Sequence, residues 1–66
     1  MRVLLRNPRR ELDVPGPIGV SALLNRLELN RESVLVIVDG TLVTGDARIA
    51  HEATVEVRPV ISGGAL

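Results

Sequence analysis

Few residues in this chain have side chains that do chemistry. Cysteine is absent, which excludes disulfides and thiolate metal sites. The single histidine, His51, has no nucleophile or second partner spaced with it, and we expect it to be a surface loop residue. We therefore predict no catalytic residue, no metal ion and no bound cofactor, and we expect that the chain is not an enzyme.

One pattern near the C-terminal end is chemically informative, because Gly63 and Gly64 are adjacent. At average glycine usage, two adjacent glycines fall within the last four residues of about one or two per cent of chains. Glycine has no Cβ, so other groups can approach its backbone closely. From Val60 to Gly64 an extended tail reaches on the order of 17 Å, at about 3.4 Å per residue. The alternative interpretation is an inert terminus, which is common.

The composition narrows the class of protein. A chain of 66 residues forms one small domain, and its core depends on valine, leucine and isoleucine because disulfides are excluded. The net charge is zero and no aromatic residue is present, which disfavours nucleic-acid binding. The longest apolar run, residues 34–38, is too short to cross a membrane, and no targeting signal is visible. We expect a cytoplasmic protein with no membrane partner.

The first half of the chain predicts a hairpin followed by a helix. Residues 2–6 and 10–14 have strand patterns on either side of a turn at residues 7–9. Residues 15–17, Pro-Gly-Pro, end the second strand. A helix is predicted over residues 19–27, where apolar side chains recur at i, i+3, i+4 and i+7. These side chains are Val20, Leu23, Leu24 and Leu27.

The second half predicts strands at residues 34–38, 41–44 and 54–60, the first two joined by a tight turn at Asp39-Gly40. Residues 45–53 are expected to be irregular, with Ile49 as their anchor. The predicted helix must cover one face of the sheet. This order suits an α+β, β-grasp (ubiquitin-like) domain with a mixed sheet of four to five strands, one main helix and the last strand beside the first.

Several of these segments carry a resemblance to the ThiS/MoaD family of bacterial sulfur carriers. They are the hairpin, the helix start at residues 20–24, the strand and turn at residues 36–40, and the ending from Val55 to Gly64. The resemblance implies that residues 1–60 form the domain and residues 61–66 a flexible tail. It implies that a ThiF/MoeB-type activating enzyme uses ATP to adenylate Gly64. A thiocarboxylate then forms there, and its sulfur passes to a biosynthetic enzyme. Ile61, Ser62 and Gly63 would be recognised as the tail enters a partner.

The sequence departs from the family pattern in two places. His51-Glu52-Ala53 stands where an acidic-Gly-Asp turn is common, and Ala65-Leu66 follow the diglycine. Some relatives of the family carry such an extension, which a JAMM-type metalloprotease removes. We therefore predict a processing site at the Gly64–Ala65 bond. The rival interpretation is that Ala65-Leu66 is foreign to the protein.

A docking surface is predicted on the sheet face that points away from the helix. By alternation, Leu4, Leu35 and Ile37 oppose the helix-facing side chains, and Arg58 lies among them. The helix-facing side chains are Val3, Leu5, Val36 and Val38. Apolar residues on a solvated face indicate a contact patch, although scattered surface apolar residues are also ordinary.

Three functions remain open from the sequence. The leading hypothesis is a sulfur carrier of a thiamin-type or related pathway. The second is a protein modifier conjugated to target lysines through Gly64, and the third is a β-grasp binding module with an inert tail. All eight basic residues are arginine. This reflects either an arginine-biased genome or a carrier that has no lysine of its own for an activated C-terminus to attack.

Overall fold

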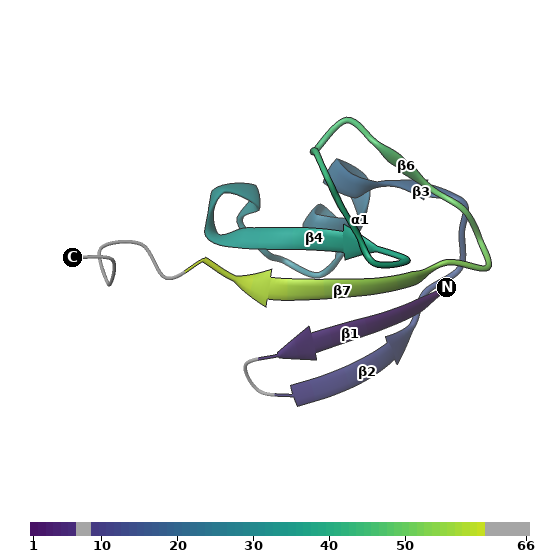
Figure 1. Cartoon of the computed structure of the whole chain (residues 1–66), viewed down its shortest axis with the longest axis horizontal. Coiled ribbons are helices and arrows are strands. Elements are labelled where there is room, and N and C mark those ends of the chain that lie inside the picture. The colour runs from purple at the N-terminus through teal and green to yellow at the C-terminus, as the bar shows by residue number, and fades with distance from the viewer. Residues whose placement is uncertain (7–8, 61–66) are drawn as a thin grey trace.

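The computed structural model of this chain describes residues 1–6 and 9–60, and shows one helix packed on a mixed sheet (Figure 1). The predicted elements occur in the predicted order, with two short strands and a 3₁₀ turn in addition. They are β1 (Arg2–Arg6), β2 (Arg9–Asp13), β3 (Ile18–Gly19), α1 (Val20–Arg26), a 3₁₀ turn (Arg31–Ser33), β4 (Val34–Val38), β5 (Thr41–Val43), β6 (Arg48–Ile49) and β7 (Thr54–Pro59).

The main sheet has five strands in the order β2-β1-β7-β4-β5. Strands β1 and β7 are parallel, with Val3 beside Val55 and Leu5 beside Val57. The other neighbouring strands are antiparallel. A parallel pair needs a crossover connection, which here includes α1. The last strand therefore lies beside the first, and the predicted β-grasp fold is confirmed.

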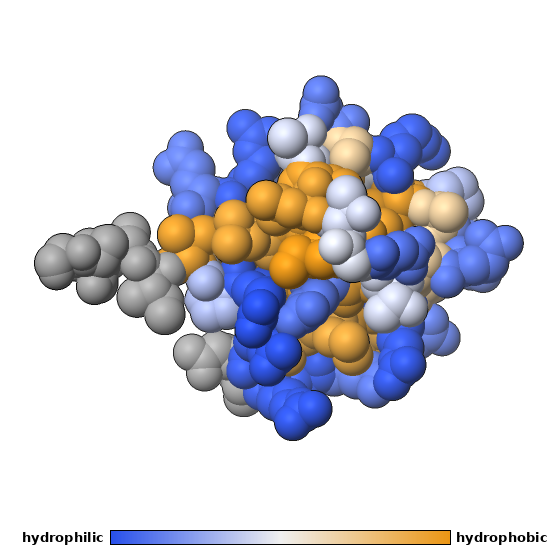
Figure 2. Space-filling view, viewed as in Figure 1, coloured by the Kyte–Doolittle hydropathy of each residue, from blue (hydrophilic) through white to orange (hydrophobic). Residues whose placement is uncertain are grey.

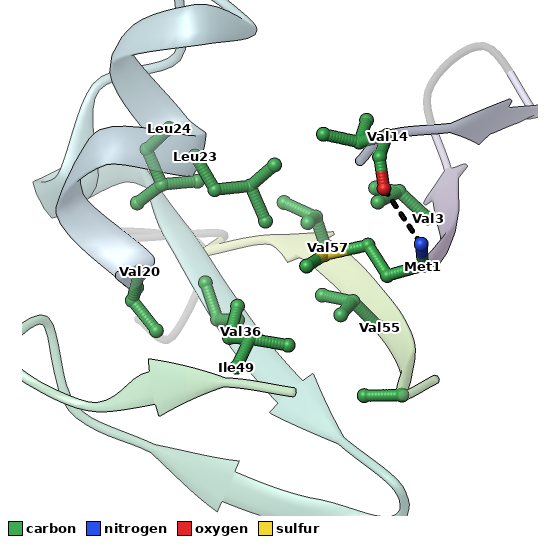
Figure 3. Packing of buried hydrophobic residues seen from close by; sticks show 11 residues of the cluster. Met1, Val3, Val14, Val20, Leu23, Leu24, Val36, Ile49, Val55 and Val57 are labelled. Carbon is green, nitrogen blue, oxygen red and sulfur yellow. Dashed lines mark hydrogen bonds between the residues drawn. The ribbon is translucent and has the colours of Figure 1, made fainter. Parts of the chain in front are cut away.

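The core fills the space between α1 and one face of the sheet (Figure 3). From the helix, Leu23 is 0% exposed, and Val20 and Leu24 are buried beside it. The sheet contributes Val3, Val36, Val55 and Val57, as the strand alternation predicts. Burial of aliphatic area is thus the main stabilising term, and within residues 1–6 and 9–60 no buried polar or charged side chain interrupts it.

Met1 is part of this core, which the sequence did not predict. Its side chain is 5% exposed. Its α-amino nitrogen donates to the Val14 carbonyl oxygen at 2.6 Å, and the Val14 amide donates back to the Met1 carbonyl oxygen at 2.9 Å (Figure 3). The Asp13 Oδ1 atom lies 3.7 Å from the same nitrogen. The start of β1 is therefore fixed to the end of the hairpin.

The segment expected to be irregular contains a short strand, so that prediction was incomplete. In β6, Ile49 pairs with Ile18 of β3, and Ile49 is 1% exposed, as its predicted anchor role requires. His51 is an exposed loop residue whose Nδ1 atom accepts from the Gly16 amide at 3.1 Å. A Cβ at Gly16 would lie 2.6 Å from the Met1 Cε atom and 3.2 Å from the His51 Cα atom, so a larger residue there would displace the Met1 methyl group.

The β4–β5 turn also ties the hairpin to β7. Asp39 and Gly40 both have positive φ, 50° and 85°, which suits the tight turn that their sequence predicts. The Asp39 amide donates to the Thr54 carbonyl oxygen at 2.9 Å, and its Oδ1 atom accepts from the Thr54 amide at 3.0 Å. The turn therefore fixes where β7 begins.

Glu28 ends the helix in a left-handed conformation, with φ of 60°. The next amide, of Leu29, donates to the Leu24 carbonyl oxygen at 2.9 Å, which closes the helix end. Glycine adopts this conformation without the Cβ clash that glutamate suffers. We predict that Glu28→Gly raises the free energy of unfolding by about 0.5–1 kcal/mol, measured by urea denaturation.

The matched control is Glu32→Gly, at an exposed position where φ is not positive. This change should be neutral or destabilising because it only adds freedom to the unfolded chain. Equal effects of the two substitutions would show that the helix end carries no strain.

Candidate docking face and tail exit

The tail leaves the domain from its central strand. Strand β7 lies between β1 and β4 and ends at Pro59. The Val60 amide then donates to the Ser33 carbonyl oxygen at 2.9 Å, so the described chain is held up to the base of the tail. The predicted tail residues Ile61, Ser62, Gly63 and Gly64, and the Gly64–Ala65 bond, lie outside the described residues. Their roles stay predictions.

The sheet face opposite α1, here called the outer face, carries the residues predicted for docking. Leu4 of β1 and Ile37 of β4 lie beside Glu56 of β7, one on each side of it. Leu35 lies beside Arg58 in the next row towards the tail. None of these side chains belongs to the core cluster or packs against it. The predicted strand phase is therefore correct.

The exposure of these residues differs from the expectation that they are all open to solvent. Leu35 is 43% exposed and Arg58 is exposed, whereas Leu4 and Ile37 are half-buried. The physical reason is their position in the middle of the sheet, where long side chains of neighbouring strands cover part of them. Leu42 of β5, beside Ile37, is 61% exposed. Leu42 was not among the residues predicted for docking, although its alternation with Thr41 and Val43 indicated this face.

An arginine cluster lies on the outer face next to the tail exit. The Glu56 Oε2 atom accepts from Arg6 Nε at 3.2 Å and Nη2 at 3.0 Å, and Arg58 Nε lies 3.3 Å from the same oxygen. Arg9 is the register partner of Arg6. Three guanidinium groups thus accompany one carboxylate, which leaves this end of the face positive and suited to an acidic partner surface.

The opposite end of the outer face carries a separate ion pair. Arg2 Nε donates to Glu11 Oε2 at 2.5 Å. This hydrogen bond lowers the pKa of the Glu11 carboxyl and raises the pKa of Arg2. Both side chains are exposed, so the pair adds little stability and is screened by salt.

Figure 2 shows how apolar and hydrophilic side chains are distributed over the outer face. Apolar surface gathers over β4 and continues towards the base of the tail, while mostly hydrophilic side chains surround a smaller apolar patch over β7, β1 and β2. Apolar surface next to a charged rim is typical of protein–protein contacts.

The described residues form an outer face of apolar and charged side chains. Among them, no group of three metal-ligating side chains comes together, and His51 is the only histidine. No helix in the described part of the chain is long and apolar enough to cross a membrane. A β-grasp domain whose last strand is followed in the sequence by a diglycine is typical of ubiquitin-like carrier proteins.

Comparison with known proteins specifies this class further. The chain belongs to the family described as small archaeal modifier protein 2, whose model matches residues 3–61. It is 40% identical over 65 residues to the sulfur carrier protein TtuB of Thermus thermophilus, a match that covers 97% of this chain and 100% of that protein. The resemblance to ThiS/MoaD-type sulfur carriers is therefore confirmed. Proteins of these families are carriers and modifiers, and the chain is not an enzyme.

Proposed function

We propose that this chain is a sulfur carrier that works through Gly64 after removal of Ala65 and Leu66. The observation that supports the proposal is the position of β7, the strand that precedes the diglycine segment in the sequence: it lies in the centre of the sheet, and the outer face carries the exposed Leu35 and Leu42. The similarity to the sulfur carrier TtuB over nearly the whole chain supports the same function. The pathway that receives the sulfur is proposed as thiamin-type or a related biosynthesis.

The chemistry takes place at the carboxylate of Gly64. A carboxylate oxygen attacks the α-phosphorus of ATP in a ThiF/MoeB-type activating enzyme, and pyrophosphate leaves. Hydrosulfide attack on the carbonyl carbon expels AMP and leaves the thiocarboxylate directly. A persulfide donor instead expels AMP to give an acyl disulfide, and a thiol of the partner then attacks the donor's sulfur, so that a disulfide forms on the partner and the thiocarboxylate leaves. Glycine suits this site because nucleotide and sulfur donor must reach a carbonyl carbon with no side chain in the way.

The domain contributes binding energy to this reaction. In our proposal the activating enzyme covers Leu35, Ile37 and Leu42 with an apolar surface and places acidic side chains opposite Arg6 and Arg58. Apolar contact gives affinity, and charge complementarity guides the approach and fixes the orientation. The sulfur-accepting enzyme would use the same tail after the activating enzyme has released it.

Ala65 and Leu66 would mask the reacting carboxylate. While they are present, the Gly64 carboxyl carbon is tied up in a peptide bond, and a branched leucine follows where the partner expects glycine. A JAMM-type zinc metalloprotease acting at the Gly64–Ala65 bond would expose the carboxylate. We therefore propose that the 66-residue chain is an inactive precursor.

The test compares the 66-residue chain with a version that ends at Gly64. Each is incubated with a cognate activating enzyme, ATP and a sulfur donor, and intact mass is measured. We expect only the shorter version to gain the mass of an oxygen-to-sulfur exchange. Thiocarboxylation of the longer chain on Leu66 would contradict the masking. If neither version reacts, the sulfur-carrier function is wrong, and lysine-linked adducts recovered from cells would then assign the modifier function.

A further inference from the structure

We propose that a groove on the helix side of the sheet binds a partner segment in which an apolar side chain stands next to a carboxylate. The groove has a volume of about 260 Å³ and lies between the end of α1 and the strands β1, β4 and β7. It is on the opposite side of the sheet from the outer face, so it is a second protein-binding site. The proposal does not depend on the sulfur chemistry of Gly64.

The groove exists because α1 is shorter than the strands it covers. Its seven residues span roughly 10 Å, whereas the six residues of β7 span roughly 20 Å. Beyond the helix end, Leu5, Val34 and Val57 therefore form a floor that α1 covers only in part. Leu27 and Leu29, which follow α1 in the chain and are half-buried, form the other side. Both sides of the groove are thus aliphatic.

The size of the groove favours one inserted side chain over a larger ligand. Cavities that bind small molecules in proteins have volumes of about 300–1,000 Å³. At about 260 Å³ this groove is smaller, and it suits a single leucine, isoleucine or methionine side chain. Inserting such a side chain between aliphatic walls removes apolar surface of both partners from water.

Arginine side chains give the groove a positive rim. Arg6 and Arg10 line it, and no acidic residue of the described chain does, not even Glu28 at the helix end. The Arg6 guanidinium already donates to Glu56 at 3.0 Å. Arg10 is exposed and makes no ion pair with another described residue. The charge available to a partner at the rim is therefore that of Arg10.

The place of Arg10 in β2 explains why its charge meets the groove. Arg10 is the register partner of Leu5, whose side chain lies on the helix side, whereas Arg9 is the register partner of Arg6 on the outer face. Successive side chains of a strand point to opposite faces of the sheet. The two neighbouring arginines therefore serve different surfaces, and of the two only Arg10 lines the groove.

The charge at the rim decides which partner fits. A partner that covered the groove with apolar groups alone would take the Arg10 guanidinium out of water without a counter-charge, which is costly. A carboxylate beside the inserted side chain can accept two parallel N–H bonds from a guanidinium. A lysine or arginine in that place would be repelled. The groove thus selects an acidic segment that carries one aliphatic residue.

The test is a titration of the ¹⁵N-labelled 66-residue chain with the peptide acetyl-Gly-Asp-Leu-Asp-Gly-amide, followed by heteronuclear NMR. We expect the amide signals of Leu5, Arg10 and Leu29 to move. A peptide with serine in place of leucine, and one with asparagine in place of both aspartates, should each bind about tenfold more weakly. If the groove signals do not move, or if only those of Leu35 and Leu42 on the outer face move, the proposal is overturned.

Two substitutions in β2 form a matched pair for the same titration. Arg10→Gln removes the charge at the groove, and Arg9→Gln removes the same charge from the outer face; both residues are exposed, so the fold should persist. We expect Arg10→Gln to weaken peptide binding about tenfold and Arg9→Gln to change it less than about twofold. Equal effects would show that the peptide follows net charge and would contradict the groove. Groove signals that move on dilution of the free chain would assign the groove to a second copy, which also overturns the proposal.

Discussion

Replacing Leu23 with alanine is expected to lower the free energy of unfolding by about 2–5 kcal/mol. Leu23 is 0% exposed and lies in the middle of α1, where it meets the valines of β1 and β7. The substitution removes buried methyl groups and leaves a cavity between the sheet and the short helix. Neither the sheet nor the helix fills this cavity well. In a domain of this size such a loss is a large share of the total stability.

Urea denaturation followed by far-UV circular dichroism measures this effect, since no aromatic residue is present to report by fluorescence. The matched control is Leu42→Ala, at a leucine that is 61% exposed on the outer face. Its effect should stay within about 0.5 kcal/mol. If Leu23→Ala were as mild as the control, α1 would not be packed on the sheet as described.

The substitution Ile37→Arg is expected to weaken binding of the activating enzyme about thirtyfold or more, the effect of losing an interface hot spot. Ile37 lies between Leu42 and Glu56 in the outer face, and an arginine there adds charge where an apolar contact is proposed. The fold should persist because the side chain is outside the core and Glu56 lies beside it. Isothermal titration calorimetry with the activating enzyme gives the affinity.

The control for this substitution is Thr54→Arg, which adds the same charge at an exposed position at the start of β7, away from the tail. It should change the affinity little. A collapse of the melting temperature of Ile37→Arg would mean that Ile37 stabilises the core. An unchanged affinity with an intact fold would place the activating enzyme elsewhere on the domain.

The main elements could be predicted because their patterns are long enough to repeat. Four apolar residues at helical spacing define α1, and the valines of β4 and β7 alternate over five or six positions. The β3–β6 pair is only two residues long on each side, so no period exists to detect. The burial of Met1 depends on Val14 and Gly16, which lie beside it only once the hairpin and loop have folded.

The sequence predicts on which side of the sheet the proposed docking residues lie. It does not predict how exposed each of them is. Alternation decides that Leu4, Leu35 and Ile37 point away from α1. How much of each meets solvent depends on the neighbours in adjacent strands, and those follow from the sheet order and register. Leu42 is the most exposed of the exposed large apolar residues in the described part of the chain, because its strand lies at the sheet edge. The role of Gly64 remains a prediction that only chemistry can test.

The central position of β7 also decides when this protein can fold during its synthesis. The ribosome makes β7 after every other strand of the sheet, yet β1 and β4 meet only through it. Before Thr54–Pro59 emerge, the nascent chain holds two separate hairpins, and isolated hairpins are marginally stable in water. The β1–β7 pairing then joins residues about fifty positions apart, which is slow because a long loop must close. If translation stops before β7, no part of the domain is therefore stably folded, and proteases can cleave the chain along its whole length.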